Sequence, residues 1–290
     1  GYGPRTGSQA NGYGPGAGAG TEAGAHGGRG GWYSSSIYDD TNAPVLPGSG
    51  GGCWDGVPGK AGGGAVRIQA GGAVVISGSI LANGGSQTVG GNSGGSGSGG
   101  SIFITCRTLN GTNGLLSAVG GSSSVSIAAG GGGGRIAVAY AAVDQSALPI
   151  PTVNFTVMGG TSRWAGAIST PGEPGTIYFG DILLLSRHIS QFSGQFLAPG
   201  FTNWYPEQLT ISNIWLKFPQ VALSVTNDLV VCSNSTFVVT NALTVGGNLT
   251  AAGALDIIGP LSLGGTLSLP AGGSLRMLGN WQINDLAAGG

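Results

Sequence analysis

The densest group of side chains able to bind a ligand lies in the segment YDDTNAP, residues 38–44. Asp39, Asp40 and Asn42 carry the carboxylate and amide oxygens that Ca²⁺ prefers, which makes them a candidate calcium site. The same residue types also close turns by hydrogen bonding to their own backbone, and a structural turn is the alternative. The sequence lacks the nonapeptide repeat of calcium-binding β-rolls, in which an aspartate recurs.

Hydrolytic chemistry finds little support among the titratable residues. Glycoside hydrolysis needs two carboxylates about 5–10 Å apart, and no two of the eleven acidic residues take equivalent positions on adjacent repeats of the chain. The histidines, His26 and His188, are isolated, and neither accompanies a nucleophile elbow. We therefore predict no catalytic residue, no cofactor and no enzymatic activity. A polysaccharide-degrading enzyme is the least favoured alternative.

The cysteines and glycine runs also match no known site. Cys53, Cys106 and Cys232 fit no metal motif, and we expect buried, unreactive thiols. A disulfide between Cys53 and Cys106 is the alternative in an oxidising compartment. No glycine run is followed by the Gly-Lys-Ser or Gly-Lys-Thr of a phosphate-binding loop.

Aromatic residues gather in two regions, one before the first strand pattern and one near residues 192–218. Aromatic side chains anchor many interfaces and stack on sugars, so a subunit contact or glycan-binding patch is one interpretation. Packing within the core is the other. The candidate residues are Trp204, Tyr205, Trp215, Phe218, Trp32 and Trp54.

The sequence contains internal repeats, and the fold of these repeats must position the side chains named above. Four segments share a small-residue entry followed by alternating apolar residues, as in GGGAVRIQA from Gly62. Their first apolar positions, spaced 36, 34 and 41 residues apart, are Val66, Ile102, Ile136 and Ile177. Between them, Gly-Gly pairs begin at Gly84, Gly120 and Gly159, each followed by a glycine-rich stretch before the next strand.

The C-terminal third repeats with a shorter period of 18 to 20 residues. Three sets of apolar residues correspond between successive repeats: Leu223, Leu243 and Leu261; Leu229, Leu249 and Leu267; and Phe237, Leu255 and Leu275. A repeat of this size cannot bury its apolar side alone, and stacking of identical repeats would bury it.

We therefore predict an all-β fold, a single-stranded parallel β-helix with long glycine-rich insertions in its N-terminal half. The insertions either pack as polyproline-II-like segments or stay mobile. No stretch shows convincing helical periodicity. The predicted parts are a glycine-rich lead-in at 1–61, repeats with glycine-rich excursions at 62–181, and compact repeats at 182–290.

The pattern resembles glycine-rich repeat regions of large secreted bacterial cell-surface proteins. The resemblance rests on the HGGRG motif at 26–30, on Tyr38 to Gly52, on Ala61 to Gly85 and on Gly97 to Tyr140. It covers roughly residues 20–180. It implies a parallel β-helix in an extracellular adhesin-like or matrix-forming protein, and it assigns no catalytic residue.

The composition also argues against two kinds of partner, nucleic acids and membranes. Charged residues make up only 7% of the chain and the net charge is −1, which argues against a nucleic-acid partner. No apolar run reaches the length of a membrane-spanning helix, so membrane insertion is not expected. We predict a secreted structural protein outside the cell or on its surface, which self-associates into a homopolymer such as a filament, sheath or stalk. The alternative is an adhesin-type module that binds polysaccharide.

Overall fold

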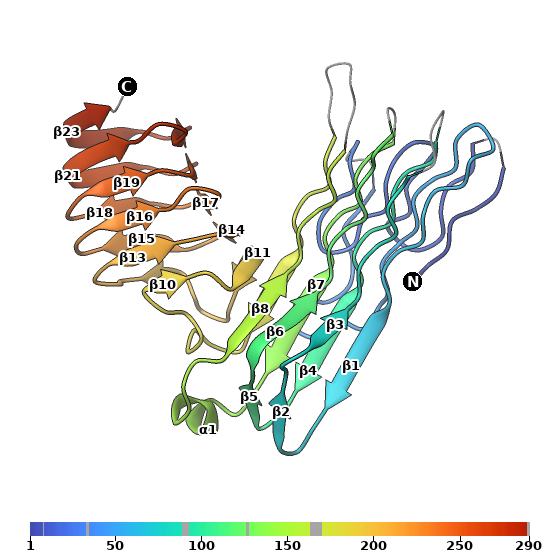
Figure 1. Cartoon of the computed structure of the whole chain (residues 1–290), viewed down its shortest axis with the longest axis horizontal. Coiled ribbons are helices and arrows are strands. Elements are labelled where there is room, and N and C mark those ends of the chain that lie inside the picture. Colours follow the sequence, from blue (N-terminus) through green and yellow to red (C-terminus); the bar gives the residue numbers. More distant parts are fainter. Residues whose placement is uncertain (8, 33–34, 89–92, 126–127, 163–169, 289–290) are drawn as a thin grey trace. The chain divides into compact units, whose positions relative to one another are not determined.

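The computed structural model describes residues 1–7, 9–32, 35–88, 93–125, 128–162 and 170–288. The chain divides into two compact units, Gly1–Gly180 and Asp181–Gly290. Within each unit the strands run parallel to their neighbours in every ladder between named strands (Figure 1). The predicted all-β class is therefore confirmed, and its sheets are parallel. Within the described ranges, no helix is long and apolar enough to span a membrane.

The N-terminal unit builds its strands from four successive repeats of the chain. Its elements are β1 (Ala65–Gln69), β2 (Ala73–Val75), β3 (Ser79–Leu81), β4 (Ser101–Thr105), β5 (Thr108–Asn110), β6 (Thr112–Ser117), β7 (Arg135–Ala139), α1 (Ala142–Ser146), β8 (Thr152–Thr156) and β9 (Thr176–Phe179). One sheet has the order β1-β4-β7-β9, a second β3-β6-β8, and a third joins β2 to β5.

The register of the first sheet follows the sequence repeat. Val66 pairs with Ile102, Ile102 with Ile136, and Ile136 with Ile177. This confirms the predicted correspondence of the four segments. The last three side chains are fully buried, because β-branched residues at the same register stack along the sheet and exclude water together.

One short helix, α1, follows β7, although no stretch of the sequence shows convincing helical periodicity. The β2–β5 pair gains no third strand there, and Gln145 of α1 bonds Leu109 of β5 instead. The helix has five residues and no side-chain cap at its N-terminus. Neither periodicity nor a capping motif therefore marks it in the sequence.

The glycine-rich insertions are packed rather than loose wherever the structure describes them. Along residues 95–100 each backbone amide donates to a neighbouring segment, and the partner segment recurs at every third residue. The amides of Gly97 and Gly100 donate to carbonyls of the segment that contains Ala82 and Gly85. Those of Gly95 and Ser98 donate to Gly52 and Ser49 in the lead-in. Those of Ser96 and Gly99 donate to Ala129 and Gly132 in the next insertion. Three residues per turn is the period of a polyproline-II helix, whose backbone has no internal hydrogen bonds to compete.

Close approach between repeats explains why glycine occupies one register position repeatedly. A Cβ atom on Gly100 would collide with the carbonyl oxygen of Gly64, one on Gly134 with that of Gly100, and one on Gly175 with that of Gly134. We call these four residues the glycine ladder. Only a residue without a side chain allows backbones this close.

The C-terminal unit stacks compact repeats. Its strands are β10 (His188–Ile189), β11 (Phe192–Leu197), β12 (Asn203–Trp204), β13 (Leu209–Ile211), β14 (Trp215–Phe218), β15 (Ala222–Val225), β16 (Leu229–Val231), β17 (Thr236–Val239), β18 (Leu243–Val245), β19 (Leu249–Ala251), β20 (Ala254–Ile257), β21 (Leu261–Leu269), β22 (Ser274–Met277) and β23 (Trp281–Ala288). The strands from β10 to β21 each pair with a strand one repeat further along the chain, as β15 with β18 and β18 with β21.

All three predicted apolar columns of this unit are confirmed by the pairing. Leu223 pairs with Leu243 and Leu243 with Leu261. The columns that begin at Leu229 and Phe237 are paired in the same way. Most of these side chains are buried, so a continuous apolar column forms the core of the unit.

Candidate functional site

The N-terminal unit contains an open hollow of about 510 Å³, within the usual size range of small-ligand sites. It is lined by Gln9, Ala19, Gly20, Thr21, Glu22, Trp32 and Trp54. The structure thus brings together two of the tryptophans that the sequence marks as glycan or interface candidates. The polar residues of the lining were not predicted, because they lie in a glycine-rich lead-in without a motif.

A tight turn presents Trp54 to the hollow. The backbone amides of Trp54 and Val57 each donate to the other residue's carbonyl, at 3.1 and 2.8 Å. Between them Asp55 and Gly56 have φ of 49° and 76°, the two positive values of a type I′ turn. The Asp-Gly pair is the sequence signal for this turn. The ring of Trp54 packs over Gly20, where an added Cβ would lie 3.0 Å from its Cε3 atom.

Trp32 lines the hollow with its backbone in an unusual conformation. Its φ is 72°, a region that bulky side chains rarely occupy and that costs about 1–3 kcal/mol. Hydrogen bonding of the preceding residue, Gly31, to the carbonyl of Gly130 anchors the segment to the glycine-rich core. The ring is 38% exposed, so a large apolar surface stays in contact with solvent.

Glu22 supplies the charge of this site. Its Oε2 accepts a hydrogen bond from the amide of Ala19 at 3.1 Å, and its carbonyl accepts one from Gly52. These bonds fix the residue on the packed glycine segments. Of the seven described residues in the lining, Glu22 alone is ionisable, so its carboxyl group is the acidic group of the lining.

A second group of polar residues is sealed inside the same unit. His26 Nε2 lies 3.3 Å from Asp39 Oδ2, and its Nδ1 lies 3.1 and 3.2 Å from the carbonyl oxygens of Gly99 and Gly100. Arg135 donates to the carbonyl of Tyr38 and to Thr176 Oγ1 at 2.9 Å each. His26, Tyr38, Asp39, Ser101 and Arg135 form what we call the His26 cluster. Sequence reasoning missed it, because its members come from segments up to 109 residues apart.

Asp39, one of the calcium candidates, is saturated by donors from its own chain. Oδ2 accepts from the amides of Val45 and Leu46 and from the hydroxyl of Ser101, and Oδ1 from the amide of Asp40. Burial alone would raise its pKa, but hydrogen bonds from His26 and from the backbone lower the pKa to about 2.

The other calcium candidates lie on the turn beside Asp39. Asp40 Oδ1 accepts the amide of Asn42 at 3.0 Å, an Asx-type turn. Among the described residues no three His, Cys, Asp or Glu side chains are grouped to hold a metal ion. The geometry that the structure gives these three residues is that of a hydrogen-bonded turn.

Ser101, His26 and Asp39 are the residue types of a hydrolytic triad, but their order differs from one. The Ser101 hydroxyl donates to the carbonyl of Leu46 at 2.6 Å and to Asp39, whereas activation as a nucleophile would require a bond to the histidine. Both His26 and Ser101 are fully buried. The cluster therefore has the geometry of a structural network. His188, the other histidine, bonds the hydroxyl of Ser212 on the C-terminal unit.

Cys53, Cys106 and Cys232 are all free thiols, so the alternative of a disulfide does not apply. Cys53 is buried and its Sγ donates to the carbonyl of Gly7. Burial raises the pKa of Cys106, which lowers its thiolate fraction and its reactivity.

The aromatic candidates of the C-terminal unit separate into core and surface. Phe218 is fully buried, and its ring contacts those of Phe196, Phe201, Trp204 and Phe237 edge-on, with centroids 5.5 to 6.1 Å apart. Trp215 is half-buried, and Tyr205 is 72% exposed. The structure therefore places Phe218 in the core. Of the other aromatic candidates in this unit, Trp204 contacts its ring.

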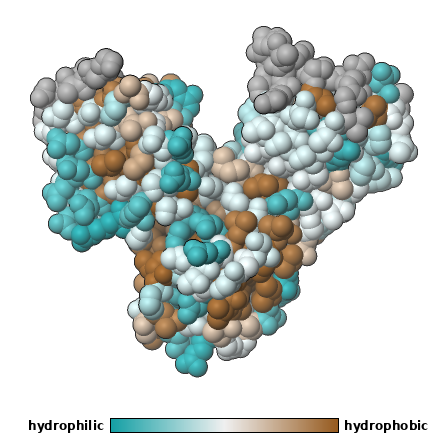
Figure 2. Space-filling model, in the orientation of Figure 1, coloured by the Kyte–Doolittle hydropathy of each residue, from teal (hydrophilic) through white to brown (hydrophobic). Residues whose placement is uncertain are grey.

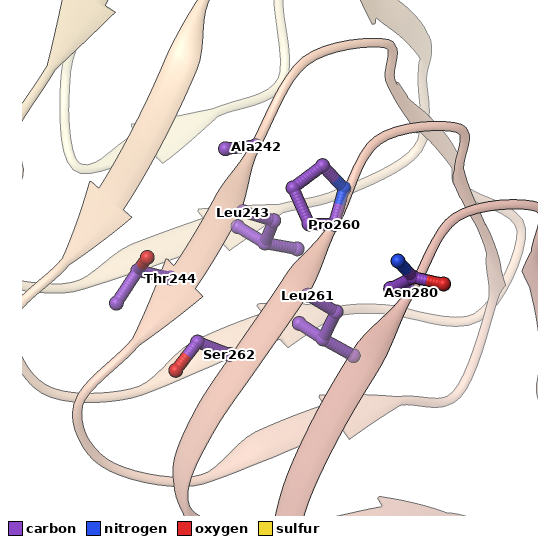
Figure 3. A pocket seen from close by; sticks show the side chains of 7 residues that line it. All are labelled: Ala242, Leu243, Thr244, Pro260, Leu261, Ser262 and Asn280. Atoms are coloured by element: carbon purple, nitrogen blue, oxygen red, sulfur yellow. The ribbon is translucent and has the colours of Figure 1, made fainter.

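A shallower hollow of about 360 Å³ crosses three neighbouring strands of this unit (Figure 3). Its lining is Ala242, Leu243, Thr244, Pro260, Leu261, Ser262 and Asn280. Thr244 and Ser262 lie side by side in the same register. No ionisable side chain stands among these described residues.

Comparison with known proteins adds no relative. Neither a protein-family model, nor a curated protein, nor a solved structure matches this chain.

Proposed function

We propose that this chain is an extracellular structural protein, a subunit of a filament, sheath or surface stalk that assembles through the free edges of its strands. The resemblance to glycine-rich surface-protein repeats points to the same class. We also propose that the C-terminal unit is a parallel β-helix, in which every 18 to 20 residues complete one coil. The unbroken parallel register from β12 through β15 and β18 to β21 supports this coil.

The observation that carries the proposal is an open edge on the N-terminal unit. Within the described residues, β1, β2 and β3 each pair with one strand only. Apolar side chains on this edge remain in water, with Val75 66% and Leu81 57% exposed. Figure 2 shows hydrophobic surface over the strand region of this unit and a paler surface over its glycine segments. Unpaired strand edges are templates for further strands.

The glycine ladder supports addition of another repeat at this edge. At Gly100, Gly134 and Gly175 only glycine fits, because a Cβ atom would collide with a carbonyl oxygen of the preceding repeat. A Cβ atom on Gly64 would meet nothing within 4 Å. Glycine at position 64 therefore leaves room for an incoming backbone that the monomer does not supply. A second row of equivalent glycines also lies against carbonyl oxygens of the preceding repeat: Gly97, Gly131 and Gly172. In the first repeat the equivalent residue is not glycine but Ala61, which is exposed.

Ala61 restricts where the added chain fits. Its methyl group occupies the place at which an incoming carbonyl would stand next to the glycine segments. Assembly is thus confined to β1, β2 and β3. We propose that the occupant is a second copy of this chain, joined head to tail through β22 and β23, each of which pairs with one strand within the described residues. Head-to-tail contacts that do not close into a ring give filaments.

Gly64→Ala tests the proposal directly. The added methyl has space in the monomer and blocks the incoming backbone, so we expect an unchanged circular dichroism spectrum and loss of the filaments that the unaltered chain forms in electron micrographs. Gly180→Ala, another glycine with open space around its Cβ position, serves as the matched control. A double change, Val75→Lys with Leu81→Lys, should also abolish assembly, because lysine on a strand edge discourages pairing.

Two results would overturn the proposal. One is a chain that sediments as a monomer at every concentration tested. The other is filament formation by Gly64→Ala and by the double lysine variant equal to that of the unaltered chain. Antibody labelling of intact, unpermeabilised cells tests the extracellular location separately.

A further inference from the structure

The hollow between Trp32 and Trp54 is built differently from the rest of the surface. The exposed apolar side chains of strands β2 and β3, such as Val75 and Leu81, lie outside this hollow. Here two indole rings are held next to solvent by special backbone conformations, a positive φ at Trp32 and a type I′ turn after Trp54. Strained or tightly specified backbone that exposes apolar rings is a feature of ligand sites.

The composition of the lining indicates what kind of ligand fits. The indole rings offer flat apolar surfaces that also carry an N–H donor. Gln9 and Thr21 both donate and accept hydrogen bonds, and Glu22 accepts them. Such a set matches a ligand with flat C–H faces and many hydroxyl groups, which each donate one hydrogen bond and accept others. Pyranose sugars with mostly equatorial hydroxyls have this combination.

Charge selects among sugars. Glu22 is the one ionisable residue of the described lining. An acidic polysaccharide would bring further negative charge next to this carboxylate. The ligand is therefore a neutral sugar chain. A proline-rich peptide also stacks on aromatic grooves, but it presents few hydroxyl groups to Gln9, Thr21 and Glu22.

We propose that the Trp32–Trp54 hollow is a binding site for neutral oligosaccharide chains. The two rings stack on sugar faces, and the polar residues orient the hydroxyl groups between them. Among the described residues of the lining, Glu22 is the one carboxylate, and we propose a site that binds a glycan. This inference does not depend on assembly: a monomer carries the whole site.

Titration with glucose-based and N-acetylglucosamine-based hexasaccharides, followed by tryptophan fluorescence and calorimetry, tests the proposal. We expect saturable binding of at least one of these two neutral probes, and no binding of a galacturonic-acid hexamer of the same length. Trp32→Ala and Trp54→Ala should each weaken binding about tenfold or more, which corresponds to about 1.4 kcal/mol. Tyr205→Ala, which removes an exposed aromatic ring outside the hollow, should leave binding unchanged.

Conservative variants keep the test valid if an alanine variant misfolds. Trp54→Phe retains an aromatic face and should bind the neutral sugar with intermediate affinity. Glu22→Gln keeps a hydrogen-bond acceptor for the amide of Ala19, and it should bind the acidic hexamer better than the unaltered chain does. The proposal is overturned if neither neutral probe binds, if both tryptophan-to-alanine variants bind as tightly as the unaltered chain, or if a proline-rich decapeptide binds and the sugars do not.

Discussion

His26 and Asp39 meet in a contact that water does not reach, with Nε2 3.3 Å from Oδ2 and side-chain exposures of 0% and 4%. The other ring nitrogen, Nδ1, faces the carbonyl oxygens of Gly99 and Gly100. Both ring nitrogens therefore lie within hydrogen-bonding distance of oxygen atoms. The ring also lies 4.7 Å from that of Tyr38. These contacts join the lead-in segment to the repeat that follows it.

Replacement of Asp39 should destabilise the N-terminal unit strongly. Asp39→Asn keeps the size of the side chain but can set an amide N–H group against the buried donors that Oδ2 now accepts from, the amides of Val45 and Leu46 and the hydroxyl of Ser101. A buried donor left without an acceptor costs about 1–3 kcal/mol. Urea denaturation measures the loss. Asp40→Asn is the matched control, because Asp40 is exposed and its carbonyl-type acceptor for Asn42 survives the change. Equal stability of the two variants would show that the carboxylate of Asp39 contributes nothing.

Acid should weaken the same unit through Asp39. The folded protein lowers the pKa of this group from 3.8 to about 2, so the folded state binds the proton less readily than the unfolded chain. The stabilisation is complete above pH 3.8 and disappears as the pH falls through about 2. Unfolding free energies measured from pH 5 to pH 2 should decline more steeply for the unaltered chain than for Asp39→Asn. Parallel profiles would contradict this assignment.

The glycine ladder makes opposite predictions for two residues of the same type. Gly100→Ala forces a methyl group against the backbone oxygen of Gly64, where no flexible side chain can move aside. It should lower the free energy of unfolding by about 1–3 kcal/mol. Gly64→Ala meets open space in the monomer and should change stability by no more than about 1 kcal/mol, in the stabilising direction. Thermal unfolding of both variants under monomeric conditions provides the comparison. A similar loss in both would refute the ladder.

Much of the strand pairing could be predicted because it repeats. The four apolar positions from Val66 to Ile177, and the columns that begin at Leu223, Leu229 and Phe237, were aligned from sequence and pair in that register. In a stack, equivalent residues of successive repeats become neighbours, so internal similarity reports contacts directly. Whether the glycine stretches pack or move could not be decided, since composition alone permits both.

The candidate sites were harder to predict because they do not repeat. Trp32 and Trp54 were recognised as candidates, but their meeting depends on a positive φ and on packing over Gly20. His26 and Asp39 were each noted for other reasons, and nothing in their local sequence links them to Ser101 or Arg135. Contacts of this kind follow from how the lead-in folds onto the repeats, which a single sequence does not encode as a pattern.

The contact between α1 and β5 leads to the last prediction. The amide of Leu109 donates to Gln145 Oε1 at 2.8 Å, and Gln145 Nε2 donates to the carbonyl of Leu109 at 3.1 Å. A side-chain amide here replaces the backbone of a third strand beside β2 and β5. Gln145→Leu should leave both backbone groups of Leu109 buried without partners, at about 1–3 kcal/mol each.

Hydrogen exchange gives this prediction a local readout. In Gln145→Leu the amide of Leu109 should exchange much faster, whereas the amides of β4 and β7 in the neighbouring sheet keep their protection. Gln145→Glu retains the acceptor but sets a carboxylate oxygen against the carbonyl of Leu109, so it should keep the amide protected and still lose stability. Ser146→Ala, one position further on an exposed part of α1, is the control. Unchanged exchange at Leu109 in Gln145→Leu would mean that solvent or another group takes over the role of the glutamine.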